Sequence, residues 1–202
     1  MSCEIIGAVL AGGENSRFPK LKGFIEISGS TIISRNISIL REVCGEVMIS
    51  TNMPEAYLYL GEKMIGDVLK SRGPMSGIHA CLLNADGEGV FVAACDMPFI
   101  KKELIELVLD EYRKERPVAA IPLWDEKPEP LLGIYRKELI PLFEKAIFDS
   151  QTSIADFLKG IDAYFIPANT IRKEDATGRS FVNINTIEDF EKNIGVSFYL
   201  NS

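Results

Sequence analysis

The stretch Ile5–Gly23, which reads IIGAVLAGGENSRFPKLKG, decides the fold class of this chain. Its apolar part, Ile5–Leu10, has the length and the Ile/Val content of a strand that is buried on both faces. The strand gives way directly to Ala11, Gly12 and Gly13. Adjacent glycines relax the limits on backbone φ and remove side chains, so successive N–H groups can face a phosphate or a base edge. The stretch therefore predicts a buried strand that delivers the chain into a nucleotide-binding loop.

Cations follow the paired glycines at Arg17, Lys20 and Lys22, where their charge could hold a polyphosphate. Arg17 is the best candidate, because a planar guanidinium forms bidentate contacts with phosphate. The alternative is a plain glycine turn with solvated cations beyond it.

The composition of the whole chain is that of an ordinary globular protein. Its 202 residues predict one domain, residues 1–202, with a substantial core. The formal net charge of −7 argues against a nucleic-acid-binding or membrane-binding surface, since both need clustered cations. An anionic ligand must therefore be met by local cations and a metal ion.

Cysteine and histidine usage narrows the chemistry further. The four cysteines form no CxxC pair and lie mostly in apolar runs, which is typical of reduced, buried thiols in a cytoplasmic protein. His79 is the only histidine, and its place near the start of a predicted helix favours a packing role over catalysis. The sequence has no signal-type segment and no apolar run of membrane-spanning length, so we expect the protein in the cytoplasm.

Strands and helices alternate through the first half of the chain. Strands are expected at 5–10, 24–27, 46–51, 63–66 and 90–94, and helices at 31–43, 55–60, 78–84 and 101–115. This alternation predicts an α/β fold whose mostly parallel sheet is covered by helices on both faces. Ligands of such a sheet gather at the carboxyl ends of its strands.

The second half departs from this alternation. Strands are expected at 118–123, 131–135 and 163–166, and helices at 137–148, 153–158 and 187–193. The polar, proline-rich loop 124–130 is too short for a crossover helix, so we expect antiparallel pairing at that point and a mixed sheet. Residues 169–179 are mostly polar and are expected to form a mobile loop. Thr186 is the expected cap of the last helix.

Polar residues follow several of these strands and are expected to converge at one edge of the sheet. They lie at Gly12–Lys22, Asn52, Asp67–Gly77 and Asp96. A carboxylate directly beyond a buried strand, as at Asp96, can hold Mg²⁺, which would bridge triphosphate oxygens and offset charge during nucleotidyl transfer. The alternative for Asp96 is a turn or capping aspartate before Pro98.

Two further side chains have a functional and a structural interpretation. Asp67 could accept two hydrogen bonds from the N1–H and N2 amine of guanine, which adenine cannot offer, or it could be an ordinary strand-end aspartate. Trp124 could stack on a flat acceptor ring, or it could cover apolar surface at a rim.

Several of these motifs together carry a resemblance to one family. LAGG at Leu10–Gly13, followed by Ser16–Phe18 and Lys22–Gly23, resembles the signature loop of the nucleotidyltransferases of the MobA family, the molybdenum cofactor guanylyltransferases. Gly73–Gly77 (GPMSG) resembles the GPxxG loop of that family, Cys95–Pro98 (CDMP) its aspartate motif, and Asn183–Thr186 (NINT) its paired asparagines. The resemblance implies a three-layer α/β/α Rossmann-like nucleotidyltransferase fold. It also implies a nucleotide-binding half at about 1–100 and an acceptor-binding half at about 101–202.

The resemblance also implies roles for single residues. Arg17, Lys22 and Asp96 are expected to be catalytic, with Asp96 as the metal ligand. Contacts to the nucleotide are expected from Leu10, Ala11, Gly12, Gly13, Lys22, Asn52, Asp67, Gly73 and Asp96. Asn183 and Asn185 are expected on the acceptor side, with both amides on one face of an alternating segment.

Two positions stay open within the resemblance. Phe18–Lys20 stands where the family normally has glycines, so Lys20 competes with Lys22 for the phosphate. Ser50 competes with Asn52 for the nucleotide contact, and Asn52 is equally suited to a turn before a proline.

The function that the resemblance implies is Mg²⁺-dependent transfer of GMP from GTP to the phosphate of molybdenum-bound molybdopterin. LAGG together with GPxxG resembles the guanylyl branch of the family rather than the cytidylyl branch. Transient contact with cofactor-insertion proteins or apo-molybdoenzymes belongs to the same expectation. The alternatives are a nucleotidyltransferase that uses CTP or a sugar-phosphate acceptor, and a non-catalytic GTP-binding module.

Overall fold

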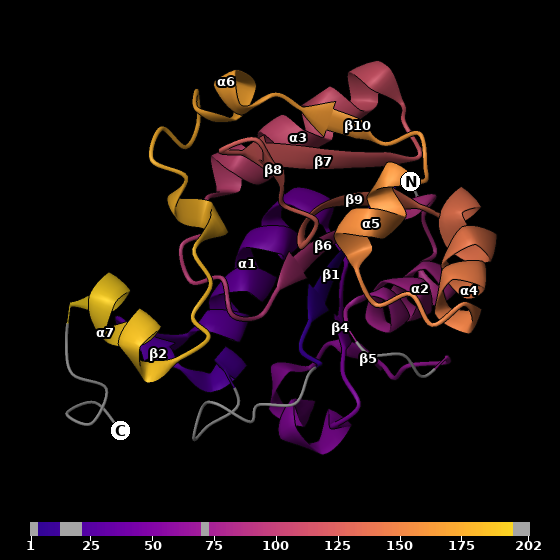
Figure 1. Ribbon diagram of the computed structural model, residues 1–202. Coiled ribbons are helices and arrows are strands. Elements are labelled where there is room, and N and C mark those ends of the chain that lie inside the picture. The colour runs from indigo at the N-terminus through magenta and orange to yellow at the C-terminus, as the bar shows by residue number, and fades with distance from the viewer. Residues whose placement is uncertain (1–3, 13–21, 70–72, 196–202) are drawn as a thin grey trace.

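The computed structural model describes residues 4–12, 22–69 and 73–195 (Figure 1). The predicted site residues Gly13, Arg17 and Lys20 lie outside the described residues. The strands are β1 (Ile5–Leu10), β2 (Glu26–Ile27), β3 (Ser30–Thr31), β4 (Val47–Ser50), β5 (Lys63–Ile65), β6 (Gly89–Ala94), β7 (Ala119–Trp124), β8 (Lys127–Pro128), β9 (Leu132–Arg136) and β10 (Tyr164–Ile166). The α-helices are α1 (Ile32–Cys44), α2 (Met75–Asn84), α3 (Lys102–Glu115), α4 (Ile140–Phe148), α5 (Ile154–Lys159), α6 (Ala168–Ile171) and α7 (Ile187–Ile194). Short 3-10 helices lie at η1 (Lys22–Phe24), η2 (Pro54–Ala56), η3 (Leu58–Leu60), η4 (Lys137–Leu139) and η5 (Arg179–Phe181).

In the described residues, eight strands form one mixed sheet. Its order is β10-β7-β9-β6-β1-β4-β5, and β8 pairs with β7. β1 pairs in parallel with β4 on one side and with β6 on the other. β9 runs antiparallel to both β6 and β7. The expected mostly parallel sheet with antiparallel pairing in its second half is confirmed.

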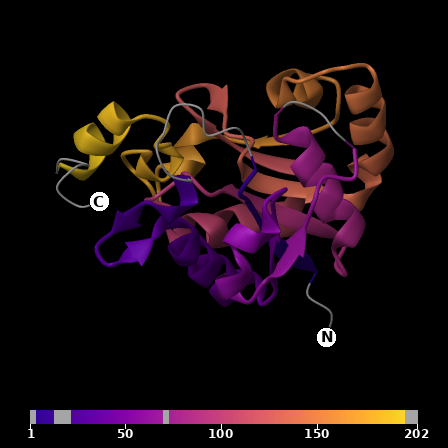
Figure 2. The same cartoon turned by 90° about the horizontal axis from the view of Figure 1, so that it is seen from below.

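Helices cover both faces of this sheet, as Figures 1 and 2 show. Successive residues of β1 point into two different cores: Val9 packs with α1 and α3, and Ala8 packs with α2 and α4. β6 divides in the same way, with Phe91 in the first core and Val92 in the second. A strand buried on both faces must be apolar along its whole length, which explains the uninterrupted run of β1. The three-layer α/β/α architecture is confirmed.

Helix α1 packs unusually close to the central strand. The hydroxyl of Thr31 caps the helix by accepting a hydrogen bond from the backbone N of Ser34 at 3.3 Å. A Cβ atom at Gly7 of β1 would lie only 3.1 Å from Cβ of Leu40, so glycine lets the helix approach. The same approach brings Asn36 within hydrogen-bond reach of the end of β6.

Two segments of the second half differ from expectation. The expected irregular loop at 124–130 instead contains the hairpin of β7 and β8, whose turn residues Asp125 and Glu126 have φ of 45° and 63°. The segment 169–179, expected to be mobile, contains α6 and the buried carboxylate of Asp175. The polar composition of this segment predicted mobility, but its polar residue Asp175 is buried and accepts a hydrogen bond from the backbone N of Ser180.

The C-terminal helix packs against an early part of the chain. Ile184 and Phe190 form a small core with Ile25 and Ile32, which places α7 beside β2 (Figures 1 and 2). Thr186 caps α7 as predicted, within a capping box completed by Asp189. None of the helices in the described residues is both long enough and apolar enough to span a membrane.

Candidate active site

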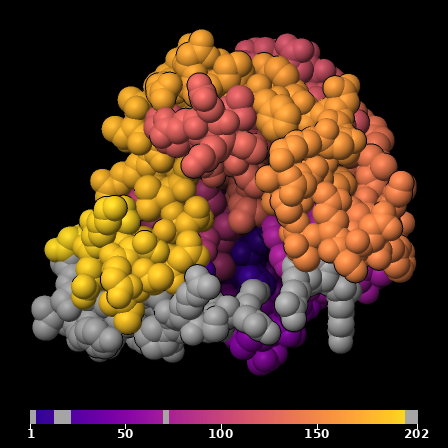
Figure 3. Space-filling view, in the orientation of Figure 1, coloured from indigo at the N-terminus to yellow at the C-terminus, as the bar shows by residue number. Residues whose placement is uncertain are grey.

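The carboxyl ends of the parallel strands meet at one edge of the sheet. Leu10, the last residue of β1, pairs with Ser50 of β4 and with Ala94 of β6. Ser50 in turn pairs with Ile65 of β5. The loops after these strands therefore lie side by side, as the sequence predicts. Figure 3 shows a hollow on this side of the molecule, between the yellow C-terminal segment and the orange residues around α5.

Asp96 lies in the turn that directly follows β6. The backbone N of Cys95 donates to the carbonyl O of Leu10 at 3.1 Å, which ties the turn to β1. The backbone N of Ile184 donates to the carbonyl O of Asp96 at 2.9 Å, which ties the turn to the C-terminal segment. The Asp96 carboxylate is 16% exposed and lies 3.2 Å from Nζ of Lys22. The fold thus fixes the backbone of Asp96 and leaves its carboxylate beside a cation.

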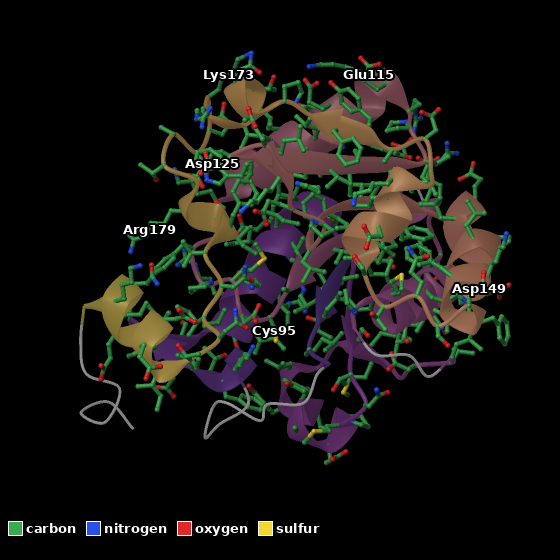
Figure 4. The ribbon with its side chains drawn as sticks, in the orientation of Figure 1. Cys95, Glu115, Asp125, Asp149, Lys173 and Arg179 are labelled. Atoms are coloured by element: carbon green, nitrogen blue, oxygen red, sulfur yellow. The ribbon has the colours of Figure 1, made fainter. Side chains whose placement is uncertain are left out.

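Lys22 joins two motifs that lie far apart in the sequence. Besides Asp96, its Nζ donates a hydrogen bond to Oδ1 of Asn185. The backbone N of Asn185 donates to Oδ2 of Asp189 at 3.0 Å, so the capping box of α7 holds this asparagine in place. Lys22, Asp96 and Asn185 form one cluster, called the lysine cluster below. Figure 4 labels Cys95, the residue before Asp96, between the C-terminal segment and β1.

Asn183 and Asn185 have different hydrogen-bond partners. Nδ2 of Asn183 donates to the carbonyl O of Phe181 at 3.1 Å, whereas Oδ1 of Asn185 accepts from Lys22. Residues 182–185 form no strand, but Ile184 is buried between the partly exposed Asn183 and the exposed Asn185. The acceptor-side role of both asparagines stays a prediction.

Asn52 and Asp67 are joined by two hydrogen bonds and lie at the same edge of the sheet as the lysine cluster. Nδ2 of Asn52 donates to Oδ2 of Asp67 at 2.7 Å, and the backbone N of Asp67 donates to Oδ1 of Asn52 at 3.0 Å. The asparagine therefore orients the carboxylate. Both residues come from loops that follow neighbouring strands, β4 and β5.

Ser50, the competitor of Asn52, is buried below the start of α2. Its hydroxyl forms a hydrogen bond with the thiol of Cys81. Burial raises the pKa of that thiol to about 12. A Cβ atom at Gly77 would lie 2.7 Å from Oγ of Ser50, so α2 packs with its backbone directly on the end of β4. Ser50 is 3% exposed, and Asn52 is the polar residue that lies at the surface of this edge.

Two glycines of the predicted site, Gly73 and Gly12, differ in whether the local structure favours glycine. Gly73 has φ of +98°, a conformation that favours glycine, and a Cβ there would lie 3.0 Å from the carbonyl O of Thr152. A Cβ at Gly12 would meet no described atom within 4 Å, so packing does not require glycine at that position. Gly12 directly follows Ala11, whose backbone N donates to the carbonyl O of Ser50 at 2.8 Å.

The thiol and imidazole groups of this region are poorly suited to nucleophilic or base chemistry. Burial raises the pKa of Cys95 to about 12, aided by the nearby carboxylate of Asp96, so the thiol stays protonated at neutral pH. His79 belongs to α2, is 1% exposed, and has its Nε2 3.4 Å from Oε1 of Glu144 in α4. Its burial agrees with the packing role predicted from sequence.

Residues 7–168 match the family model of the MobA-like NTP transferase domain. The chain belongs to this family. A probable molybdenum cofactor guanylyltransferase of Methanosarcina mazei is 36% identical, over 93% of this chain and 88% of that protein. The molybdenum cofactor guanylyltransferase of Desulfosudis oleivorans is 32% identical, over 93% of each chain. The crystal structure of molybdopterin-guanine dinucleotide biosynthesis protein A from Archaeoglobus fulgidus matches with a TM-score of 0.81 and 30% identity, over 95% of this chain and 97% of that one.

An NTP transferase acts on a triphosphate, a ligand that commonly carries Mg²⁺. Mg²⁺ is commonly held by one or two carboxylates together with substrate phosphates and water. Asp96 offers one partly exposed carboxylate, and Asn185 an amide oxygen. The described residues contain no group of three His, Cys, Asp or Glu side chains that could form an all-protein metal site. This donor set fits an ion that arrives with the nucleotide.

Sequence reasoning missed Asn36 and left two roles open for Trp124. Asn36 is a polar residue at a position of α1 where the helical spacing of the sequence predicts a buried side chain, and that mismatch could have singled it out. Trp124 lies with its ring 5.7 Å from that of Phe181 and 4.8 Å from the guanidinium of Arg172. A Cβ at Gly178 would overlap the indole, so Trp124 packs against backbone on that side. These contacts favour the covering role of Trp124.

Proposed function

We propose that this nucleotidyltransferase is a molybdenum cofactor guanylyltransferase. It transfers GMP from GTP to the phosphate of molybdenum-bound molybdopterin and releases pyrophosphate. The observation that carries the proposal is the lysine cluster, which lies at the same sheet edge as the Asn52–Asp67 pair. Two relatives with that activity in their names, at 36% and 32% identity over most of the chain, support it.

Asp67 supports the choice of guanine as the base. A carboxylate has lone pairs for about four hydrogen bonds, of which the Asn52 amide uses one. The remaining acceptors can meet the N1–H and N2 amine of guanine together. Adenine has an acceptor at N1 and would face the carboxylate unfavourably.

The chain's own residues align the reactants and neutralise charge. The acceptor phosphate is already an anion, so no protein base has to activate it. Lys22, which lies between Asp96 and Asn185, can turn its ammonium group to a substrate phosphate, and Arg17 is expected to supply a second cation. The neutral Cys95 thiol below the site agrees with direct transfer rather than a covalent intermediate.

Asp96 is the residue that would hold Mg²⁺, with Asn185 beside it. The ion supplies charge neutralisation on the triphosphate and on the leaving pyrophosphate. With Asp96 in this role, Lys22, which now forms an ion pair with Asp96, would be available to bind a substrate phosphate. Lys22 would thus neutralise Asp96 before the nucleotide binds and a phosphate afterwards.

The wider setting follows from the same proposal. The acceptor half, about residues 101–202, would bind the molybdopterin. The protein would work in the cytoplasm and hand the product to cofactor-insertion proteins or apo-molybdoenzymes.

The test is pyrophosphate release with Mg²⁺ from GTP, CTP, ATP and UTP in separate reactions. Each nucleotide is assayed alone, with molybdenum-loaded molybdopterin, and with a sugar 1-phosphate. Release confined to GTP plus the pterin is the expected result. Release with CTP, or with the sugar phosphate, would replace the proposal by one of the alternative transferases. GTP binding without release in any mixture would point to a binding module.

A further inference from the structure

Asn36 lies on the buried face of α1, directly against the turn that carries Asp96. Its side chain is 1% exposed. Nδ2 donates to the carbonyl O of Ala94 at 3.0 Å and to the carbonyl O of Met97 at 3.2 Å. Ala94 is the last residue of β6, and Met97 directly follows Asp96. A single amide group therefore ties together the two ends of the turn.

The orientation of this amide follows from its partners. Both partners are carbonyl oxygens, so the NH₂ group and not the oxygen must face the turn. The oxygen, Oδ1 of Asn36, is buried and has no hydrogen-bond partner in the described residues. An unpartnered buried acceptor is unfavourable, and neighbouring positions of the same helix face, Ile33, Ile37 and Leu40, are aliphatic. Asn36 therefore provides something that an aliphatic residue cannot.

The other contacts of the turn hold different backbone atoms. The backbone N of Cys95 is bonded to β1, and the carbonyl O of Asp96 is bonded to the C-terminal segment. Among the described side chains, only that of Asn36 donates hydrogen bonds to the carbonyl oxygens of Ala94 and Met97. Removing the amide would free the turn on the α1 side while its other attachments stay.

We infer that Asn36 is a positioning residue, which fixes the Asp96 turn so that the carboxylate is held at the lysine cluster, where it would meet the metal ion that accompanies the substrate phosphates. This inference rests on the proposed function, because the aim matters only if Asp96 works in transfer. The two hydrogen bonds of Asn36 go to backbone carbonyls, so it would act on Asp96 through the backbone of the turn. A misplacement of about 1 Å at a reacting group can lower a rate by about 100-fold.

The test compares Asn36→Leu, which has the same branching at Cγ and lacks the amide, with the wild-type protein. The matched control is Leu40→Ala, which opens the core one turn further along α1. Each protein is first examined without nucleotide by amide hydrogen exchange of the peptide covering residues 94–100. Turnover of GTP, its KM and the Mg²⁺ concentration for half-maximal rate are then measured per folded molecule.

For Asn36→Leu we expect faster exchange in the 94–100 peptide, a kcat lowered by ~10–100-fold and little change in the KM for GTP. The Mg²⁺ concentration for half-maximal rate should rise several-fold. Asn36→Ser, which keeps one O–H donor, should recover part of the lost kcat. Leu40→Ala should lower the melting temperature while leaving exchange of this peptide and kcat close to the wild-type values.

Two failures can be told apart. A wild-type protein that releases no pyrophosphate from GTP with any acceptor would overturn the proposed function, whatever the exchange data show. A working wild type together with an unchanged kcat, Mg²⁺ requirement and exchange rate in Asn36→Leu would overturn the role of Asn36. If Asn36→Leu does not fold, Asn36→Ala, which also lacks the amide, gives the same comparison, and a wild-type kcat, Mg²⁺ requirement and exchange rate for it would contradict the inference.

Discussion

Two carboxylate–lysine pairs in this molecule have similar lengths and different surroundings. Asp96 Oδ2 lies 3.2 Å from Lys22 Nζ, and Asp175 Oδ1 lies 3.4 Å from Lys101 Nζ. The Asp96 side chain is 16% exposed, whereas that of Asp175 is 0% exposed. Asp175 also accepts a hydrogen bond from the backbone N of Ser180 at 2.7 Å. The same pair of charges is thus locked into the fold in one region and left at the surface of a hollow in the other.

The difference separates a structural carboxylate from one that is free to change partners. Burial would raise the pKa of Asp175, but its hydrogen bonds with Ser180 and the nearby Lys101 outweigh burial and lower it. The ionised form is therefore the one that the fold stabilises. Asp96 faces Lys22, which is itself 20% exposed, and under the proposed function a cation that arrives with substrate would replace the ammonium group.

The largest expected effect is on activity, at Asp96. Asp96→Asn keeps the size of the side chain and removes its charge, so kcat for pyrophosphate release should fall by ~10²–10³-fold, as for other lost electrostatic contacts in active sites. The free energy of unfolding should change by less than about 1 kcal/mol, because the ion pair is partly exposed. Turnover and urea unfolding are measured on the same preparation. Wild-type turnover would remove Asp96 from the reaction.

The reverse pattern is expected at Asp175. Asp175→Asn places an NH₂ group or an uncharged oxygen against the backbone N of Ser180 and against Lys101, and should lower the free energy of unfolding by ~1–3 kcal/mol. Turnover per folded molecule should stay near the wild-type value, since Asp175 is fully buried away from solvent. Urea unfolding and activity in the folded range check both parts. An unchanged unfolding midpoint would show that the buried network contributes little.

A smaller, selective effect is expected at Asp67. Asp67→Asn removes the charge and replaces one carboxylate oxygen by an NH₂ donor, so guanine loses one of its two acceptors and the preference for GTP over ATP should fall about 10-fold, equivalent to about 1.4 kcal/mol. The matched control is Glu55→Gln, which neutralises an exposed acid on the nearby 3-10 helix η2. Competition between GTP and ATP is measured for each variant. Equal losses of preference in both variants would indicate a general charge effect rather than base recognition.

The smallest effect is a pH dependence at Asp175. The pKa in the folded protein lies below the ordinary value of 3.8, so the unfolded chain binds the proton more readily. The stability from this carboxylate is therefore complete above the unfolded pKa and is lost as pH falls through the folded pKa. The difference in unfolding free energy between wild type and Asp175→Asn should shrink as pH falls below 3.8. A difference that stays constant over that range would contradict the assignment.

Much of the fold could be predicted from local sequence patterns. The apolar run of β1 is diagnostic because both of its faces are buried, and Thr186 with Asp189 gives a recognisable helix start. The hairpin at Asp125 and Glu126 was not predicted, since neither residue is typical of a left-handed turn as glycine is. The burial of Asp175 was missed because polar composition does not reveal a buried partner.

The candidate site was predictable in its positions and less so in its contacts. Asp96, Asn52 and Asp67 follow β6, β4 and β5, and the parallel pairing of β6 and β4 with β1, and of β5 with β4, brings these strand ends to one edge. The contact of Lys22 with Asn185 spans 163 residues, and those of Asn36 span 58 and 61 residues. Contacts of that separation depend on tertiary packing, which no local pattern records.

The most direct test of the contrast between the two carboxylates is Mn²⁺ binding in the presence of GTP, followed by electron paramagnetic resonance. Mn²⁺ replaces Mg²⁺ as a probe that can be observed without turnover. Wild type and Asp175→Asn, the latter at a temperature where it is folded, should bind one Mn²⁺–GTP with similar affinity, and Asp96→Asn should bind it at least about 10-fold more weakly. Equal affinity of Asp96→Asn and wild type would contradict the claim that Asp96 exchanges its lysine for the metal that accompanies the nucleotide.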